Sequence, residues 1–379
     1  MRTEQLEWTS SRGWHPPVGE GAGPGADLVL VFGGSGVLRD SAPLGELRDR
    51  YPDAIIGGCS TAGEILDTRV SDGSIVATAV AFESTRVRAA EMTLSGDADS
   101  RQAGRKLAAQ LTGDDLVHIL VFSDGLTVNG SELSRGMMDR LPVGVLVTGG
   151  LAGDGTDFTE TFVVSGAEAT ARRLVAIGLY GDRLRVGCGS VGGWDPFGPE
   201  RLITRSHGNV LYELDGRSAL ELYKSYLGDY ASNLPASALL FPLSLRSGVH
   251  GPPVVRTVLS IDEAEGSMTF AGDLPEGHYA RLMRANFERL IDGASDAARA
   301  SHETIGRRTP GLAVLISCVG RRMVLQQRIE EEIESVREIL GPDATLAGFY
   351  SYGEIAPFSP SEPCELHNQT MTITTLTED

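Results

Sequence analysis

The chain has 379 residues, of which 41% are hydrophobic and 22% are charged. This composition is typical of a soluble globular protein with two domains. The formal net charge of −18 repels phosphate backbones and anionic lipid, which disfavours nucleic acid and membrane surfaces as partners. No run of about 18 apolar residues occurs, so the sequence predicts no membrane span. The N-terminal residues also lack the apolar stretch of a secretory signal.

The four cysteines are far apart in the sequence and include no CxxC pair. They are Cys59, Cys188, Cys318 and Cys364. Such spacing does not suit a disulfide framework or a zinc ribbon. It favours reduced thiols, and we therefore expect a cytoplasmic protein.

The first half of the chain predicts alternating strands and helices after a flexible arm at 1–25, which is polar and rich in glycine and proline. Two runs, 74–82 and 86–94, predict a β-hairpin. The glycine- and proline-rich segment 191–199 predicts irregular backbone. The other expected strands are 28–32, 54–57, 116–122, 143–149, 160–164, 173–180, 184–190 and 200–206, and the expected helices are 43–51, 100–111, 131–140 and 216–227.

In the second half, apolar residues recur every three to four positions over 278–299 and 321–340, which predicts two amphipathic helices. We expect an α/β fold with two domains, 26–226 and 227–379, in which mixed β-sheets are flanked by helices. The expected strands of this half are 237–245, 253–260, 267–271, 311–318, 345–350 and 370–376.

One pattern occurs three times: an apolar strand, a helix, a second strand, and then a loop with glycine and an acid. The three loops lie at 58–65, 149–154 and 348–355, and their acids are Glu64, Asp154 and Glu354. A repeated packing turn would explain this pattern. Ligand-binding loops gathered at strand ends would explain it equally well. Both interpretations predict internally repeated strand–helix–strand units.

The motifs of several common enzyme classes do not occur in the sequence: there is no GxxxxGK[ST], HExxH or GxSxG. A GxGxxG pattern at Gly187, Gly189 and Gly192 leads into the irregular segment instead of a helix, so it lacks the helix N-terminus that binds phosphate. A hydrolase that uses the three repeated acids in one cleft is the enzymatic alternative. Nothing in the sequence sets the pKa values of these acids apart, so we expect no catalysis.

The loops resemble the FIST family of sensory domains. The resembling segments read IGGCSTAGEI at 56–65, GGLAGD at 149–154, GFYSYGEIAP at 348–357 and CELHNQTMT at 364–372. The resemblance covers about 26–376, as an N-terminal FIST half followed by a C-terminal FIST half. It implies a bacterial signal-transduction sensor that binds a small, amino-acid-like ligand and acts through a separate partner protein.

The segment LISCVGRR at 315–322 resembles a haem-binding, nitric-oxide-sensing subset of this family, whose partners are histidine kinases or cyclic-di-GMP enzymes. This second resemblance implies haem as an alternative ligand. The iron would then need an axial donor, for which His367 is the first candidate and Cys364 the second. A lone histidine is more often simply hydrogen-bonded, so a structural role for His367 stays open.

We expect the ligand site at the third loop, where Tyr350 and Tyr352 bring aromatic surface and hydroxyl groups beside Glu354. Alternation along a strand places these two tyrosines on one face, and Phe349 and Ser351 on the other. One face must belong to the core, and the sequence does not say which.

Four further residues complete the expected site. Asn368 and Gln369 begin the neighbouring final strand and add amide donors. Arg256 and Arg321 are the candidates for binding a carboxylate, because a guanidinium group forms bidentate hydrogen bonds with it.

Overall fold

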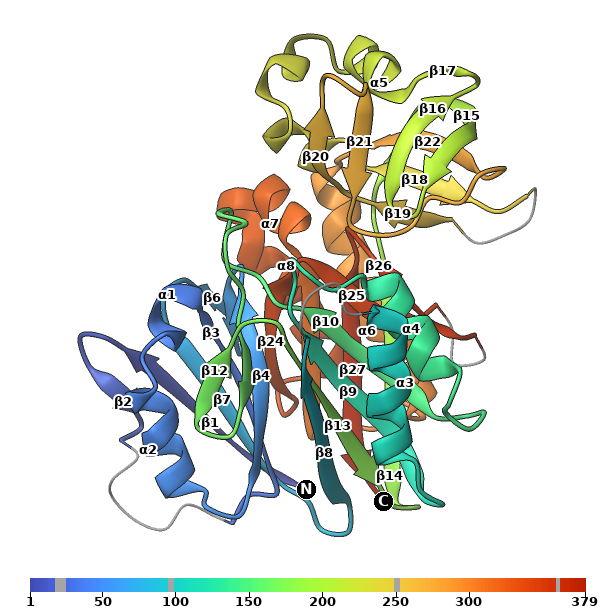
Figure 1. Ribbon diagram of the computed structural model, residues 1–379. Helices are drawn as coiled ribbons and strands as arrows, with labels where there is room; N and C mark the ends of the chain where they lie inside the picture. Colours follow the sequence, from blue (N-terminus) through green and yellow to red (C-terminus); the bar gives the residue numbers. More distant parts are fainter. Residues whose placement is uncertain (18–24, 95–98, 249–252, 359–361) are drawn as a thin grey trace.

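The computed structural model describes residues 1–17, 25–94, 99–248, 253–358 and 362–379. Figure 1 shows a large body that holds both chain termini, and a smaller lobe that stands on it. Three sheets with flanking helices form the body, and a fourth sheet forms the lobe. The predicted α/β fold with mixed sheets is therefore confirmed. Within the described ranges, no helix is long and apolar enough to cross a membrane.

The body contains three copies of one strand–helix–strand unit, which confirms the internal repeat. Each unit has a parallel pair of strands: β3 (Leu28–Gly34) with β4 (Ile55–Thr61), β9 (Leu116–Ser123) with β10 (Leu146–Leu151), and β23 (Leu312–Cys318) with β24 (Thr345–Ser351). The helical segments between the paired strands are α1 (Ser35–Leu38), α2 (Ala42–Arg50), α4 (Gly130–Met138), α7 (Val319–Leu325), η3 (Gln326–Arg328) and α8 (Ile329–Leu340). An antiparallel strand flanks the first strand of each pair: β7 (Ile75–Ala81), β13 (Arg173–Tyr180) and β27 (Met371–Glu378).

The three units exchange strands, so that they interlock. The strand that follows each parallel pair joins a neighbouring unit: β5 (Glu64–Leu66) pairs with β24, β11 (Val163–Ser165) with β4, and β25 (Gly353–Pro357) with β10. Each turns back as a hairpin with β6 (Arg69–Ser71), β12 (Glu168–Thr170) or β26 (Cys364–His367). At the outer edges, β8 (Arg86–Thr93) pairs with β13, β14 (Leu184–Val191) with β27, and β1 (Arg2–Thr9) with β7. Each unit therefore receives an edge strand from another part of the chain, and β1 is the one that the first unit receives.

Two expectations for the first unit differ from the structure. Residues 1–17, expected as part of a flexible arm, form β1 and β2 (Gly13–His15), which pair with each other; residues 18–24 of that arm lie outside the described ranges. The runs at 74–82 and 86–94 are strands but do not form a hairpin. Every residue of β7 is buried and the strand lies between β1 and β3, whereas β8 is a partly exposed edge strand of another sheet. The two runs therefore belong to different sheets and do not pair with each other.

Both long helices expected in the second half are interrupted. The first is replaced by β22 (Tyr279–Arg284), followed by α6 (Phe287–Thr304), because Asn286 caps the helix by accepting a hydrogen bond from the backbone N–H of Arg289. The second is divided into α7, η3 and α8, and Gln326 adopts a φ of +49° at the break. The body also contains α3 (Ser100–Leu111), which packs on α4.

The small lobe spans 195–284, and its two connections to the body pair with each other, Asp195 opposite Arg284. The segment expected as strand 237–245 begins as a 3₁₀ helix, and the segment expected to be irregular is extended from Asp195 onward. The elements of the lobe are β15 (Asp195–His207), β16 (Val210–Leu214), β17 (Arg217–Ser218), α5 (Ala219–Leu227), η1 (Gly228–Asn233), η2 (Ala236–Leu240), β18 (Leu243–Arg246), β19 (Val254–Arg256), β20 (Val258–Asp262), β21 (Ser267–Phe270) and β22.

Close packing explains the GxGxxG pattern. A Cβ atom on Gly187 would lie 2.0 Å from the carbonyl oxygen of Ser301, and one on Gly189 would lie 2.1 Å from that of Ala297. Both carbonyl groups belong to α6, so the absence of side chains lets this helix rest directly on β14. The pattern is therefore a packing feature in this chain.

Candidate functional site

The three glycine–acid loops meet at the strand ends, as one of the two interpretations of the repeat predicts. The backbone N–H of Ala62 donates to the carbonyl oxygen of Tyr350 (2.8 Å), and the N–H of Tyr350 donates to Gly63 (2.9 Å). The second loop joins the first through the N–H of Gly153, which donates to the carbonyl oxygen of Ser60 (2.9 Å). The loops thus hold the three units together at one end of the body.

Glu64 and Glu354 occupy equivalent buried positions. In each turn the hydroxyl group three residues earlier, on Thr61 or Ser351, donates to the carboxyl group of the glutamate, at 2.5 Å and 2.6 Å. Burial raises the pKa of Glu64 to about 7 and that of Glu354 to about 8, although these hydrogen bonds oppose the shift. Thr370 adds two more hydrogen bonds to Glu354, from its backbone N–H and its hydroxyl group. Each acid therefore joins its own turn to another segment of the same unit, Glu64 to Ser74 and Glu354 to Thr370.

Asp154, the acid of the second loop, stabilises a different turn. Its carboxylate accepts hydrogen bonds from the backbone N–H groups of Phe158 (3.0 Å), Thr159 (2.7 Å) and Glu160 (2.9 Å), and from the hydroxyl group of Tyr352. Burial alone would raise the pKa of Asp154, but these donors lower it overall. The three repeated acids accept hydrogen bonds from separate sets of donors, which supports the interpretation of the loops as packing turns.

The buried glutamates predict a loss of stability between pH 6.5 and about 8. A raised carboxyl pKa means that the folded protein keeps protons that the unfolded chain has released, so stability falls as pH rises through this window. Below pH 6.5 two buried histidines have the opposite effect on stability. Burial lowers the pKa of His118 to about 3 and of His367 to about 4, so in this range the unfolded chain binds more protons at these residues than the folded protein does. The titration of Glu354 alone should lower the free energy of unfolding by about 2 kcal/mol between pH 6.5 and 8. Urea unfolding of Glu354→Gln across this range should show a flatter profile, and an unchanged slope would contradict the assignment.

Tyr350 and Arg321 are placed in the core of the third unit. Arg321 and Glu332 are both fully buried and form an ion pair at 2.8 Å. The Tyr350 hydroxyl group donates to the same carboxylate at 3.2 Å. Both faces of β24 are covered, since Phe349 stacks on Phe32 in the centre of the body with ring centroids 4.7 Å apart. The structure thus assigns Tyr350 and Arg321 to internal support.

Asn368 and Gln369 are buried, and they offer acceptors instead of the expected donors. The Asn368 amide nitrogen donates to the carbonyl oxygen of Tyr352 (3.4 Å), and that of Gln369 donates to the hydroxyl group of Thr257 (3.0 Å). Among the residues that the structure describes, the carbonyl oxygens of both side chains find no hydrogen-bond donor. The Gln369 contact ties the body to the small lobe.

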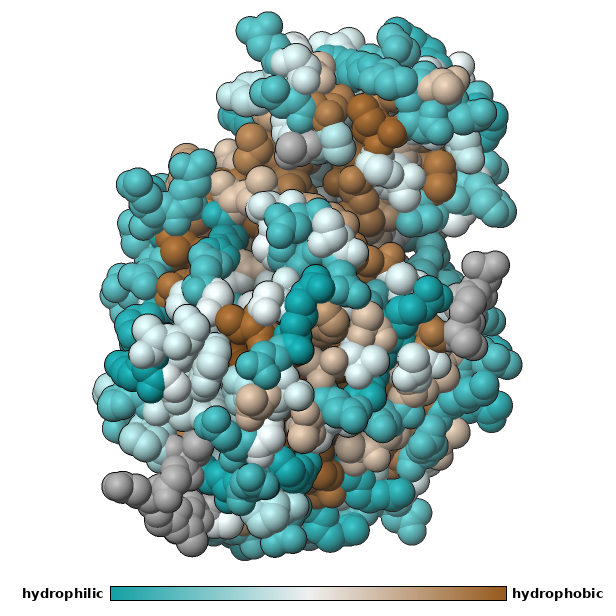
Figure 2. All heavy atoms as spheres, turned by 60° about the vertical axis from the view of Figure 1, so that its left-hand side comes forward, coloured by the Kyte–Doolittle hydropathy of each residue, from teal (hydrophilic) through white to brown (hydrophobic). Residues whose placement is uncertain are grey.

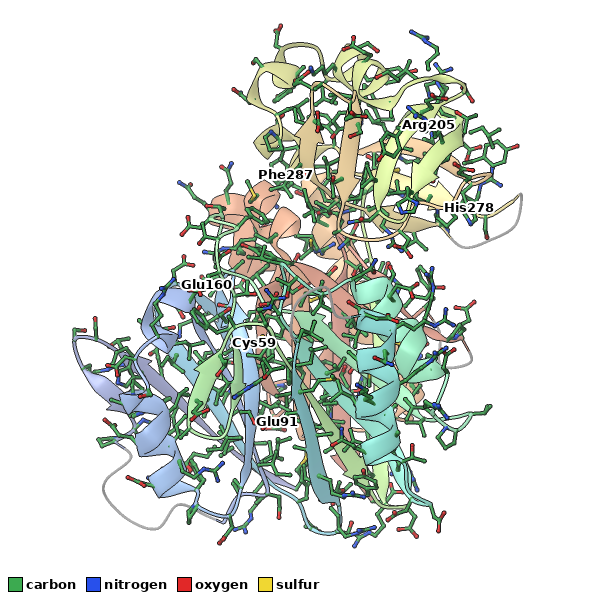
Figure 3. The ribbon with its side chains drawn as sticks, viewed as in Figure 1. Cys59, Glu91, Glu160, Arg205, His278 and Phe287 are labelled. Carbon is green, nitrogen blue, oxygen red and sulfur yellow. The ribbon has the colours of Figure 1, made fainter. Side chains whose placement is uncertain are left out.

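The haem-ligand candidates do not fit a haem in this structure. His367 is 1% exposed, and its Nε2 lies 2.8 Å from the carbonyl oxygen of Ala356, so that nitrogen carries the proton and donates it. The adjoining pocket has a volume of about 200 Å³, below the ~300–1,000 Å³ of ordinary small-molecule sites. Burial raises the pKa of Cys364, which keeps it a thiol. All four cysteines are buried and unpaired; Cys59 lies inside the body (Figure 3).

Arg256 borders a pocket of about 300 Å³ between the lobe and the body. Its side chain is 6% exposed, and its Nη1 donates to the carbonyl oxygen of Leu366 (2.9 Å). Within the described ranges, Nη2 has no hydrogen-bond partner and no carboxylate lies within ion-pair distance of the guanidinium group. Burial lowers the pKa of Arg256 to about 10, although the nearby charges of Glu365 and Asp273 oppose the shift, so the group is cationic at neutral pH. A buried cation that contacts no carboxylate of a described residue attracts an anionic ligand.

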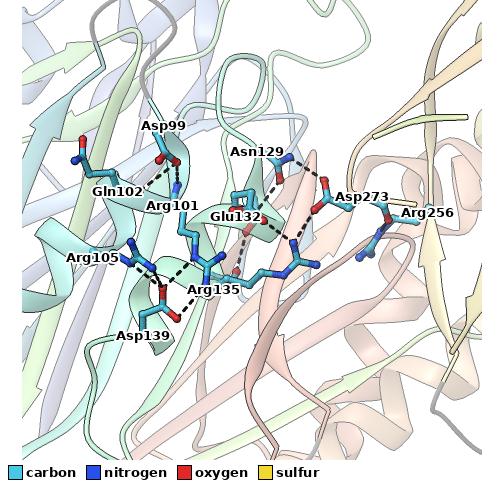
Figure 4. Close-up of polar contacts among 12 residues, drawn as sticks. Asp99, Arg101, Gln102, Arg105, Asn129, Glu132, Arg135, Asp139, Arg256 and Asp273 are labelled. Atoms are coloured by element: carbon cyan, nitrogen blue, oxygen red, sulfur yellow. Dashed lines mark hydrogen bonds and ion pairs between the residues drawn. The ribbon is translucent and has the colours of Figure 1, made fainter. Parts of the chain in front are cut away.

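Three carboxylates line the same pocket, those of Asp273, Glu362 and Glu365. Glu362 and Glu365 are both exposed and take part in no ion pair with a described residue. A third acid, Asp273, pairs with Arg135 at 2.7 Å and accepts a hydrogen bond from the Asn129 amide nitrogen at 3.0 Å. Figure 4 shows this contact, which joins the small lobe to α4. The pocket therefore presents one open cation and two open anions.

Most of these pocket residues were not predicted. Arg256 was expected from its chemistry, but its neighbours come from distant segments: Arg135 from α4, His278 from the edge of the small lobe (Figure 3), and Glu362 and Glu365 from the segment before and within β26. No local pattern marks these positions, because tertiary packing alone brings them together. Within the described part of the chain, no group of three or more histidine, cysteine or acidic residues could hold a metal ion.

Comparisons with known proteins identify the family of this chain. The FIST N domain model matches residues 27–217, and the FIST C domain model matches residues 219–357. The protein is therefore a sensory-domain protein. It belongs to the FIST family, with one N domain and one C domain in tandem, and the matches do not distinguish a haem-binding subset.

Two individual proteins are similar to this chain. The uncharacterized protein MJ1623 of Methanocaldococcus jannaschii is 22% identical over 374 residues, which cover 87% of this chain and 70% of that protein. A crystal structure of cyanuric acid hydrolase from A. caulinodans aligns with 78% of this chain and 99% of its own, at 8% identity and a TM-score of 0.18. A structural likeness this weak carries no argument about activity.

Proposed function

We propose that this protein is a non-catalytic sensor that binds a small amino-acid-like ligand in the pocket beside Arg256. The observation that carries the proposal is the buried guanidinium group, which faces a pocket without an ion-pair partner among the described residues. A ligand carboxylate would supply that partner. Because burial weakens solvent screening, this contact would be stronger than one at the surface.

The charges of the pocket suit a zwitterion. The ligand's carboxylate would bind Arg256, and its ammonium group would bind Glu362 or Glu365, which line the same pocket. Arg135 already forms an ion pair with Asp273. Arg256 is therefore the cation that is available to the ligand. An α-amino acid carries these two charges close together, which is why we place it ahead of a simple carboxylic acid.

Signalling would pass through a separate partner protein, a histidine kinase or a cyclic-di-GMP enzyme. The support for the partner class is the family resemblance. The position of the pocket supplies a route, since its walls come from the small lobe and from the body. A ligand that contacts both would change how firmly the lobe is held, and a partner could respond to that change.

A hydrolase remains the enzymatic alternative to this proposal. It would require the repeated acids to share a cleft, whereas Glu64, Asp154 and Glu354 each accept hydrogen bonds in their own turns. We therefore favour binding without turnover.

The proposal predicts that one or more of the common L-amino acids stabilises the protein in a thermal-shift screen. A ligand at 100 times its dissociation constant adds about 2.7 kcal/mol to the free energy of unfolding. Arg256→Lys should then weaken binding about tenfold or more, because a lysine cannot keep the hydrogen bonds to the carbonyl oxygens of Asp273 and Leu366 and also present a donor in place of Nη2. Calorimetric titration of the stabilising amino acid measures this loss.

Arg246→Lys is the matched control. Arg246 lies on β18, the strand paired with that of Arg256, but it forms an ion pair with Glu200 instead of lining the pocket. Its replacement should leave the affinity unchanged. Equal affinity in wild type and Arg256→Lys would contradict the site, and a panel without any stabilising amino acid would contradict the ligand class.

A further inference from the structure

We propose that a second pocket, on the Tyr352 side of the junction, binds a neutral planar aromatic molecule that carries an N–H or O–H donor. Its volume is about 290 Å³, and its lining, as far as the chain is described, includes no charged side chain. It differs in this respect from the pocket beside Arg256, which is lined by six residues with ionisable side chains. Figure 2 shows apolar surface gathered on the small lobe and along its junction with the body. The inference does not depend on the amino-acid site.

Phe158 is held at this pocket in a strained backbone conformation. Its φ is +51°, which is uncommon for a residue other than glycine and costs about 1–3 kcal/mol. The carboxylate of Asp154 maintains the conformation by accepting hydrogen bonds from the backbone of Phe158 and the next two residues. The resulting ring is 37% exposed and stacks on Tyr352, with centroids 4.5 Å apart and planes inclined by 14°. This turn therefore presents a flat aromatic surface at the pocket.

Apolar side chains from both parts of the molecule complete the walls. Leu126 from the body and Leu259 from the small lobe are each 40% exposed, although both line the pocket. A planar apolar ligand would cover these surfaces together with the ring of Phe158. Its aromatic ring would gain the offset stacking or edge contact that aromatic pairs prefer.

One polar group indicates the donor on the ligand. The amide nitrogen of Asn209 donates to the carbonyl oxygen of Phe270 at 2.7 Å, which fixes the orientation of the side chain. Its carbonyl oxygen has no hydrogen-bond partner among the described residues, so it is available as an acceptor at the pocket. An indole N–H or a phenol O–H supplies the missing donor, whereas a carboxylate supplies none and would be left without a cation.

Indole is the probe for this proposal, and calorimetric titration of the full chain is the measurement. Phe158→Gly removes the ring and relieves the positive φ, so folding should not suffer. Leu259→Glu places a charge on an exposed wall. Each substitution should weaken indole binding about tenfold or more. The control is Phe287→Ala, which removes another exposed phenylalanine, 46% accessible, outside this pocket (Figure 3); it should leave the affinity unchanged.

Indole-3-acetate tests the charge preference, and it should bind at least about tenfold more weakly than indole. The proposal is overturned if indole shows no saturable binding, if Phe158→Gly and Leu259→Glu bind it as wild type does, or if indole-3-acetate binds equally well. Arg256→Lys should leave indole binding unchanged. Failure of this proposal is therefore separable from failure of the amino-acid site.

Discussion

Replacing Gly348 with alanine is expected to destabilise the protein by about 4 kcal/mol or more, enough to prevent folding. A Cβ atom at this position would lie 1.8 Å from the carbonyl oxygen of Leu315 on the facing strand. The obstructing atom belongs to the backbone of a buried parallel pair, so it cannot move aside. Gly58 and Gly149 hold the equivalent positions in the other units, where the corresponding distances are 1.8 Å and 1.9 Å. Close approach of the paired strands is thus built into every unit.

Gly45→Ala is the control for this substitution. Gly45 lies inside α2, and a Cβ atom there would have no atom within 4 Å. Because alanine favours the helix, this variant should gain about 0.5–1 kcal/mol. Urea unfolding, or the yield of soluble protein where a variant does not fold, compares the two. Equal stability of Gly348→Ala and Gly45→Ala would contradict the packing of the parallel strands.

Arg321→Met is expected to destabilise the fold by about 3–5 kcal/mol, because it leaves the carboxylate of Glu332 buried without its counterion. The substitution also removes the hydrogen bond from Nη2 to the carbonyl oxygen of Leu290 (2.7 Å). Urea unfolding measures the loss. Amino-acid binding by the folded fraction should be unchanged, since Arg321 has no exposed surface and does not line the pocket beside Arg256.

The double variant Arg321→Met/Glu332→Gln isolates the electrostatic part of this loss. Without the buried charge, the side chain at 332 can still accept hydrogen bonds from Ser317 and Tyr350, which contact the native carboxylate. The double variant should therefore be more stable than Arg321→Met alone. If Arg321→Met instead abolished ligand binding at unchanged stability, Arg321 would be a ligand residue and not an internal support.

The repeated units could be predicted from the sequence because each is a local pattern. Strand, helix, strand and glycine–acid loop follow one another in the chain, and their order is visible without tertiary information. The exchange of strands was not predictable in the same way. Nothing in the residues 74–94 shows that β7 and β8 belong to different sheets, because the choice depends on β1 and β13, which lie far away in the sequence. Likewise, the spacing of apolar residues after 278 is compatible with a helix. The first of these residues form β22 instead, because β15 and β18 pair with it.

The candidate site shows the same division between local chemistry and tertiary position. Arg256 and Arg321 were equivalent in the sequence, since both are guanidinium groups on or near apolar segments. Their surroundings separate them: Arg321 is neutralised by Glu332, whereas Arg256 faces a pocket without an ion-pair partner among the described residues. Which buried arginine is left open for a ligand depends on where the acids lie, and this is a property of the folded chain.

The most direct test of the central claim, that the pocket beside Arg256 recognises a carboxylate and an ammonium group together, is a titration with matched analogues. The amino acid that stabilises the protein most would be compared with its carboxamide, which lacks the negative charge, and with its N-acetyl form, which lacks the positive charge. Calorimetry would be carried out on wild type, Arg256→Lys and Glu362→Gln/Glu365→Gln. The glutamates are exposed, so the last variant should fold normally.

The account predicts that wild type binds the free amino acid about tenfold or more tightly than either analogue. Arg256→Lys should lose much of the preference for the acid over the carboxamide, and Glu362→Gln/Glu365→Gln should lose much of the preference for the free amine over the N-acetyl form. Equal affinity of wild type for the amino acid and its carboxamide would contradict the account, because the buried guanidinium group would then play no part in recognition.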